Sequence, residues 1–266
     1  MKYFTKEWYE LCSKTTLHLA LEEEKQAEVF SEGYFQQLYN AGLESWLDLQ
    51  EEVASLMKKN ESMNANDNNE ASFNKEKEIE KFYDIFIYNQ EQLKKKLPDS
   101  ILKQIADLRV FTLDKATKTV INAVAKFCKE NERSVTTTGE CYIRYLEKSS
   151  NILDQEIIEN FRFHDCMITK SVQKDTSITL FLDNSGGFTD IDEVAFNNFT
   201  IIKQEGSLDD SWWLYEELYR VDDKYEFHVL LQDNKRCLID FIFSADQVTF
   251  KRNKVGNCSL FANPAE

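Results

Sequence analysis

Two histidines and three carboxylates in the second half of the chain have side chains that could perform catalysis. They are His164, Asp165, Glu216, Glu217 and His228. Imidazole and carboxylate groups bind zinc or manganese and also act as general acids and bases. The histidines lack the i, i+4 spacing of metallohydrolase helices, so only the fold could bring these residues together. If they converge, we expect a catalytic site, with all of them except Glu217 as metal ligands. Otherwise Asp165 turns the chain into a strand and His164 forms a structural hydrogen bond.

Other kinds of catalytic motif find no support in the sequence. Ser185-Gly186-Gly187 lies in a predicted hairpin turn and not in the strand-to-helix elbow that exposes a nucleophilic serine. Cys166 follows His164 by two residues, and in a strand this offset means only that the two side chains share a face. The chain has no phosphate-binding loop of the Walker type and no GxGxxG motif. We therefore expect no nucleotide and no other cofactor.

A group of aromatic residues makes a second kind of candidate site. Trp212, Trp213, Tyr215 and Tyr219 lie in one short segment, and large amphipathic aromatic side chains concentrate at protein interfaces. In a strand, one tryptophan faces the core and the other faces away. We expect the inward tryptophan to be ordinary packing and the outward one to be an exposed aromatic that contacts a partner.

The charge of the chain narrows the classes of partner. Its 47 acidic and 32 basic residues give a net charge of −15, which repels nucleic-acid phosphates and anionic lipid surfaces. The run Lys94-Lys95-Lys96 precedes Leu97-Pro98, where it complements the carbonyl end of a helix. We therefore expect no binding to nucleic acid or membrane, and a basic protein is the partner that the charge favours. The oligomeric state stays open.

The location expected from the sequence is the cytoplasm. The first residues carry charges every few positions and lack the apolar core of a signal peptide. No apolar run approaches the length of a membrane span. Six cysteines are spread along the chain without CxxC pairs, which argues against a disulfide framework and against a zinc finger. We expect free thiols in a reducing compartment.

The two halves of the chain differ in the period of their apolar residues. Helical spacing runs through the first half, which holds few helix breakers, and after residue 160 the period shifts towards two. Residues 59–75 are rich in Asn, Ser, Asp and Glu and predict a mobile surface loop. We therefore predict an α+β protein with a helical domain at 1–155, an antiparallel sheet domain at 156–255 and a tail at 256–266.

Five or six strands are expected in the sheet. The segments with strand character are 177–183, 194–204, 212–221, 225–232 and 237–243, with 248–252 as a sixth. The turns between them are short, which favours antiparallel pairing of neighbours. An amphipathic helix over 210–220 is the alternative for the third of these segments, and it would expose both glutamates.

A two-residue turn at Asp222-Asp223 would set the register of the central hairpin. It places Glu217 opposite His228 on the wetter face and Glu216 among apolar side chains. A buried carboxylate needs a partner or holds its proton, and we expect that partner of Glu216 to be His164 or Arg162. Glu217 is expected to matter less to folding.

Several segments resemble one known family of bacterial proteins. They are Lys2-Tyr3-Phe4-Thr5-Lys6-Glu7-Trp8-Tyr9, Leu97-Pro98, Ile105-Ala106-Asp107-Leu108-Arg109-Val110, Leu113, Phe163-His164-Asp165 and Leu214-Tyr215-Glu216-Glu217-Leu218-Tyr219. Together they resemble the uncharacterised family called domain of unknown function 4085. The resemblance touches most of the chain, and its first two segments are the most specific. Because the family carries no assigned activity, the resemblance implies a bacterial cytoplasmic setting and no mechanism.

Taken together, these features favour a non-enzymatic protein that binds another macromolecule. Strong acidity, many aromatic residues and the missing catalytic motifs all point to that class. Neutralisation of a basic toxin by an immunity-like acidic protein is one form of such binding, because negative potential steers the association. The alternative is a metal-dependent hydrolase built on His164, Asp165, Glu216 and His228.

Overall fold

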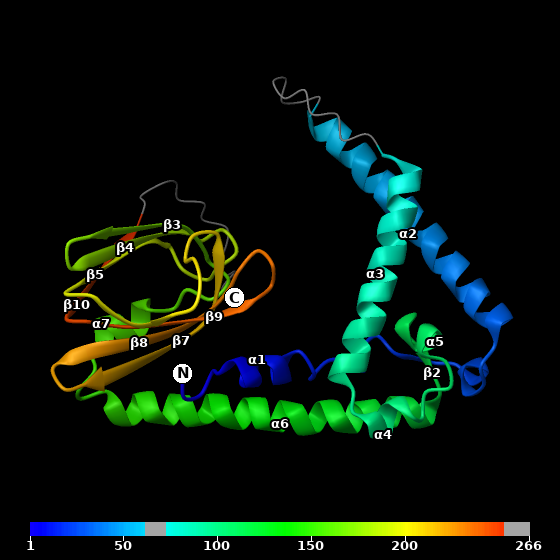
Figure 1. The fold of residues 1–266 in the computed structure, drawn as a ribbon, viewed down its shortest axis with the longest axis horizontal. Helices are drawn as coiled ribbons and strands as arrows, with labels where there is room; N and C mark the ends of the chain where they lie inside the picture. The colour runs from blue at the N-terminus through cyan, green and yellow to red at the C-terminus, as the bar shows by residue number, and fades with distance from the viewer. Residues whose placement is uncertain (62–72, 253–266) are drawn as a thin grey trace, which may run out of the picture. The chain divides into compact units, whose positions relative to one another are not determined.

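The computed structural model describes residues 1–61 and 73–252, and helices precede the main sheet in the chain (Figure 1). The helices are α1 Lys6–Cys12, the 3-10 helix η1 Lys25–Glu28, α2 Glu32–Glu61, α3 Lys75–Lys96, α4 Asp99–Leu102, α5 Leu108–Thr112, α6 Lys118–Ser149 and α7 Gln155–Asn160. The α+β class is confirmed. Most of the predicted loop at 59–75 lies outside the described residues, but helix α2 continues to Glu61.

Capping side chains explain where several helices begin. The Ser31 hydroxyl accepts a hydrogen bond from the Tyr34 N–H (3.3 Å) at the start of α2, and Asn74 accepts one from the Lys77 N–H (3.0 Å) at the start of α3. Helix α3 ends at Lys96, just before Leu97-Pro98. Helix α6 then runs without a break to Ser149.

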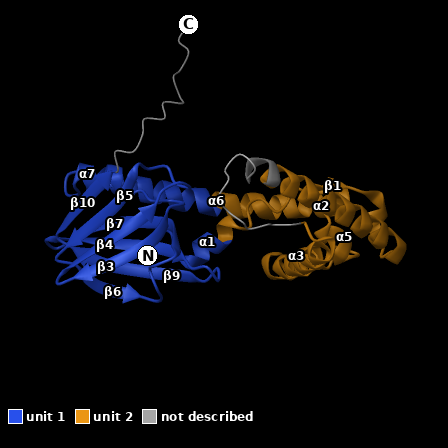
Figure 2. Ribbon diagram, turned by 90° about the horizontal axis from the view of Figure 1, so that it is seen from above, with its two compact units in different colours: residues 1–10, 134–266 blue, residues 11–133 orange. Residues whose placement is uncertain are grey.

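The chain forms two compact units, coloured separately in Figure 2. One comprises residues 11–133 and the other residues 1–10 and 134–266, so the division differs from the domain boundary expected at residue 155. The first unit has a buried core of Leu97, Ile101, Phe111, Ala116, Val120, Val124 and Cys128. In it, α2 packs against α3 through aromatic contacts such as that between Tyr39 and Phe82, whose ring centroids are 5.2 Å apart.

The second unit is built on an eight-stranded antiparallel sheet, which has more strands than the five or six predicted. The strands are β3 Met167–Lys174, β4 Ser177–Asp183, β5 Ile191–Asn197, β6 Thr200–Gln204, β7 Ser211–Val221, β8 Lys224–Gln232, β9 Leu238–Ala245 and β10 Gln247–Arg252. Their order is β10-β5-β4-β3-β7-β8-β9-β6. The segment 194–204, predicted as one strand, contributes to two, because Asn198 turns the chain with a positive φ of 51°. The first unit holds a short parallel pair, β1 Glu22–Glu23 with β2 Lys115–Ala116.

The strand order has an internal symmetry. Strands β3-β4-β5 form one meander and β7-β8-β9 form another. Strand β6, which follows β5 in the chain, pairs with β9, and β10, which follows β9, pairs with β5. The sheet curls so that its two halves face each other across the core (Figure 1). Phe196 of β5 lies 5.0 Å from Phe227 of β8 and 4.7 Å from Phe243 of β9, measured between ring centroids. This curl buries one face of every central strand and leaves the other face of β7 to be covered by other elements.

The described residues bear on the expectations about membrane spans and cysteines. No helix among them is both long and apolar enough to span a membrane. Cys12, Cys128, Cys141, Cys166 and Cys237 are all free thiols, as predicted, while Cys258 lies outside the described residues.

Candidate functional site around strand β7

Strand β7 carries most of the candidate residues, and its pairing with β8 has the predicted register. Val221 pairs with Lys224 across the turn, which puts Glu216 opposite Val229 and Glu217 opposite His228. The alternative of a helix over 210–220 is therefore wrong. A bulge between Trp213 and Tyr215 shifts the register by one residue. As a result Trp213, and not Leu214, joins Glu216 on the inner face.

The side chain of Glu217 is fully buried, with none of its surface exposed to solvent. Its two carboxylate oxygens accept backbone N–H bonds from Lys2 (2.8 Å), Tyr3 (2.8 Å) and Phe4 (2.5 Å), and the Tyr219 hydroxyl donates a fourth bond (2.6 Å). An ionised carboxylate has about four lone-pair sites, so Glu217 is saturated as an acceptor. The expectation that Glu217 lies on a wetter face is wrong, because the N-terminal segment covers that face.

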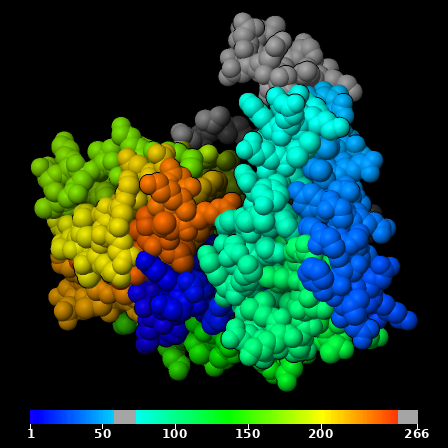
Figure 3. Space-filling model, turned by 45° about the vertical axis from the view of Figure 1, so that its right-hand side comes forward, coloured from blue at the N-terminus to red at the C-terminus, as the bar shows by residue number. Residues whose placement is uncertain are grey.

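Aromatic packing holds the N-terminal segment on β7. Phe4 lies 5.0 Å from Tyr142 and 5.4 Å from Tyr215, and Trp8 lies 4.7 Å from Tyr215, between ring centroids. Farther along, the Lys6 ammonium pairs with Glu205. Figure 3 shows this segment, in dark blue, seated against the orange part of the chain. Tyr215 and Tyr219, predicted as partner contacts, are thus largely used within the molecule.

The free edge of β7 is completed by helix α6. The Tyr142 hydroxyl oxygen accepts the backbone N–H of Leu218 at 2.8 Å, a donor that no neighbouring strand takes up. Burial raises the pKa of Tyr142 well above its usual range, so its hydroxyl stays neutral. This bond explains why the second half of α6 belongs to the same compact unit as the sheet.

Glu216 points into the opposite side of the strand from Glu217. Its carboxylate accepts a hydrogen bond from the Trp213 indole N–H at 2.7 Å and lines a small cavity of about 50 Å³. Burial raises the pKa of Glu216 to about 7, against the lowering effects of the Trp213 bond and, through charge, of His164 and Arg162. By exposed area the residue is only half-buried, but its carboxyl lies among enclosed apolar side chains, which governs its pKa. Both expected partners therefore act on Glu216 by charge, while hydrogen bonds come from the Trp213 indole and the Phe163 backbone.

His164 and Asp165 occupy a turn that leads into β3. Asp165 has a positive φ of 64°, and the ring nitrogen Nδ1 of His164 is in hydrogen-bond contact with the Leu214 carbonyl oxygen. His164 Nε2 lies 3.5 Å from Asp165 Oδ2. Cys166 next to them is buried, and burial raises the pKa of its thiol to about 11, which disfavours a nucleophilic thiolate. Asp165 therefore turns the chain into β3 and His164 forms a structural hydrogen bond, the roles expected for them if they form no catalytic site.

The five candidate catalytic residues do not converge on one point, because His164 and His228 lie near different parts of β7. His164 packs on Tyr215 and His228 packs on Tyr219, and these tyrosines are four residues apart on one strand, roughly 13 Å. His228 is held by Glu226, with Nε2 and Oε1 2.6 Å apart, and its Nδ1 is 3.9 Å from Glu217. Among the described residues, no three His, Cys, Asp or Glu side chains are placed to hold a metal ion.

One tryptophan of the pair faces inward and the other outward, as predicted, and the outward one is Trp212. It is 44% exposed, while Trp213 is completely buried. The connection between β4 and β5 passes beside it, since a Cβ built on Gly186 would lie 3.8 Å from the Trp212 ring. That connection also carries Phe188, which is 89% exposed. We call Trp212 and Phe188 the aromatic patch.

Tyr142 and Phe188 carry no motif and could not be singled out from the sequence. The fold shows that Tyr142 bonds the edge of β7 and that Phe188 is 89% exposed. The role of Glu217 was missed as well, although the alternating aromatic residues Tyr215 and Tyr219 on its face indicated a covered surface.

Comparison with known proteins supports the resemblance seen in the sequence. No curated protein and no solved structure matches the chain. The model of the family described as Protein of unknown function (DUF4085) matches residues 44–237, which is more than half of the chain. The chain therefore belongs to the DUF4085 family.

Proposed function

We propose that this protein acts by binding another protein, and that the aromatic patch is its contact surface. The observation that carries the proposal is the exposure of two large aromatic side chains, Trp212 at 44% and Phe188 at 89%. Single exposed apolar residues are common on protein surfaces, but tryptophan is among the residues that most often dominate binding energy at interfaces. Trp212 is also fixed on a central strand, so little conformational entropy is lost when a partner covers it.

Charge around the patch supports a basic partner. Asp165 has a half-exposed side chain beside Gly186, and Asp183 and Asp210 flank the two segments that carry the patch. The whole chain has a net charge of −15. Carboxylates on the segments that carry the patch match a partner whose own apolar contact is accompanied by Lys and Arg, and the negative potential speeds the encounter.

The hydrolase alternative has less support in the geometry. A hydrolytic metal needs three or more ligands around one point and an open coordination position. The carboxylate oxygens of Glu217 already accept hydrogen bonds from the N-terminal backbone. His164 and His228 lie too far apart to bind one metal ion. Binding is therefore the function that the arrangement supports better.

Co-purification from the native cells tests the proposal. We expect a protein to be recovered in near-stoichiometric amount with the tagged full-length chain and to fall at least tenfold with the double variant Trp212→Ser/Phe188→Ser, since each aromatic anchor contributes about 1–2 kcal/mol or more. Its recovery should also fall as salt is raised.

The matched control is Ile152→Ser/Val221→Ser, which removes two other exposed apolar side chains, 59% and 46% exposed, from the same compact unit. All variants should melt within a few degrees of the unmodified protein, because none of these residues is in the core. Recovery of the same proteins, in the same amounts, with both double variants would refute the patch as the contact surface.

A further inference from the structure

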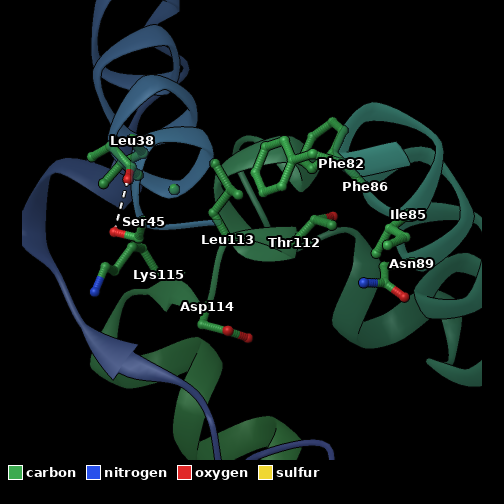
Figure 4. Close-up of a pocket in the computed structure, with 12 residues that line it drawn as sticks. Leu38, Ser45, Phe82, Ile85, Phe86, Asn89, Thr112, Leu113, Asp114 and Lys115 are labelled. Atoms are coloured by element: carbon green, nitrogen blue, oxygen red, sulfur yellow. Dashed lines mark hydrogen bonds between the residues drawn. The ribbon is translucent and has the colours of Figure 1, made fainter. Parts of the chain in front are cut away.

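A pocket of about 390 Å³ lies within the unit formed by residues 11–133. Helices α2 and α3 form its walls, and the segment that joins α5 to β2 closes one end (Figure 4). Its lining residues are Leu38, Ala41, Gly42, Ser45, Phe82, Ile85, Phe86, Asn89, Thr112, Leu113, Asp114 and Lys115. The volume is within the range of sites that bind small organic molecules.

Small residues on α2 keep the pocket open. Gly42 faces the Phe82 ring, and even a Cβ at that position would lie only 3.4 Å from the ring. Ala41 and Ser45 flank Gly42 on the same wall. A larger side chain at any of these positions would fill the space, whereas the present sequence leaves the aromatic side chains of α3 available to a ligand.

Asp114 is an exposed charged residue of the pocket. Among the described residues, no hydrogen bond or ion pair engages the Asp114 carboxylate, while the neighbouring Lys115 ammonium pairs with Glu22. Figure 4 shows the Lys115 side chain directed away from the Asp114 carboxylate. Because Lys115 and Glu22 neutralise each other, the pocket keeps a net negative charge from Asp114.

The backbone holds Asp114 in place at a cost. Its φ is 62°, in the left-handed region that only glycine, asparagine and aspartate visit readily. The Asp114 carbonyl accepts the Glu22 N–H at 2.8 Å, which ties the turn to β1. Asp114 does not start helix α6. Thr117 does, with its hydroxyl accepting the Val120 N–H at 3.4 Å, so capping does not explain the carboxylate.

We infer that this pocket binds an organic ammonium ion, with the ammonium group at the Asp114 carboxylate and an apolar group against Phe82 and Phe86. Three features support this choice of ligand. The apolar walls favour a hydrophobic body, the Asp114 carboxylate attracts a cation, and the volume of about 390 Å³ admits a small organic molecule. Neither an anion nor a purely apolar molecule would use the Asp114 charge. The inference does not depend on the proposed partner surface.

The test compares three probes of similar shape on the full-length protein. They are 2-phenylethylammonium, 2-phenylethanol and 3-phenylpropionate, each titrated while amide resonances of the isotopically labelled chain are followed. We expect the ammonium to bind at least tenfold more tightly than the alcohol, because a charge-assisted hydrogen bond contributes about that much. Shifts should centre on Gly42, Asn89 and Leu113.

Three variants make the test specific, one of them with a substitute. Asp114→Asn keeps a residue that tolerates the left-handed turn and should reduce the ammonium preference to less than about threefold. Asp84→Asn, on an exposed position of α3 outside the pocket, should leave it unchanged. Gly42→Leu should abolish binding of all three probes; if that variant does not fold, Ser45→Met takes its place. Equal affinity for ammonium and carboxylate, an unchanged preference in Asp114→Asn, or no shifts at the pocket would overturn the inference.

Discussion

Replacing Glu217 by alanine is expected to lower the free energy of unfolding by about 3 kcal/mol or more. The change leaves three backbone N–H groups and the Tyr219 hydroxyl without their acceptor in a buried site. Each such loss costs about 1–3 kcal/mol if the N-terminal segment stays in place. If the segment detaches instead, the protein loses the burial of Phe4 and Trp8 against Tyr215. Denaturant unfolding at pH 7 measures the effect.

Glu226→Ala is the matched control for this experiment. Glu226 is on the neighbouring strand and has one side-chain partner, His228, and it is partly exposed. Its loss should cost less than about 1 kcal/mol. Deletion of residues 2–4 should destabilise the protein by an amount similar to Glu217→Ala, and the two changes together should cost little more than either alone. A loss of 1 kcal/mol or less in Glu217→Ala, equal to that in Glu226→Ala, would contradict the proposed role of Glu217.

The second large effect concerns Glu216 and appears as a dependence on pH. The folded-state pKa of Glu216 is raised to about 7, while the unfolded value is near 4.5. Between these values the folded protein keeps a proton that the unfolded chain releases, so stability falls as pH rises through this window. The full difference amounts to roughly 3 kcal/mol. Groups with a lowered pKa, such as Glu205 at about 2, act only below about pH 4.5 and in the opposite direction.

Glu216→Gln should remove this pH dependence, because the amide cannot ionise and retains a carbonyl acceptor for the Trp213 indole N–H. Relative to the unmodified protein, the variant should gain stability from pH 5 to about pH 7 and then level off, measured by denaturant unfolding at each pH up to pH 8. Glu226→Gln serves as the control and should show a constant difference over that range. A constant difference for Glu216→Gln would mean that the Glu216 carboxyl is hydrated and ionised throughout.

The class of the fold was predictable because its periodicities are strong. The helical spacing of the first half and the turn at Asp222-Asp223 led to the correct class and to the correct register of β7 with β8. Strand β3 was missed because it has only one fully buried residue, Ile168, and so shows little alternation of apolar and polar positions. The boundary between β5 and β6 was missed because Asn198, without a glycine or proline, makes the turn.

The role of the candidate site was less predictable than the fold. Glu217 is held by backbone groups more than 200 positions away in the sequence, and backbone N–H groups leave no trace in residue types. The bulge in β7 puts Trp213 on the inner face in place of Leu214. No glycine in the sequence marks the position of that bulge. Strand alternation alone predicted that one of Trp212 and Trp213 is exposed and the other buried, but the bulge decides that Trp213 is the buried one.

Site-specific photo-crosslinking from position 188 tests the central claim, that the protein binds a partner through the aromatic patch. A photoreactive phenylalanine replaces Phe188 in the full-length chain in its native cells, with Val221 and Tyr83 as exposed control positions, 46% and 53% exposed. The account predicts a discrete covalent adduct with one protein from position 188, its loss in the Trp212→Ser background, and no such adduct from position 221. A discrete adduct from position 83 together with none from position 188 would contradict it.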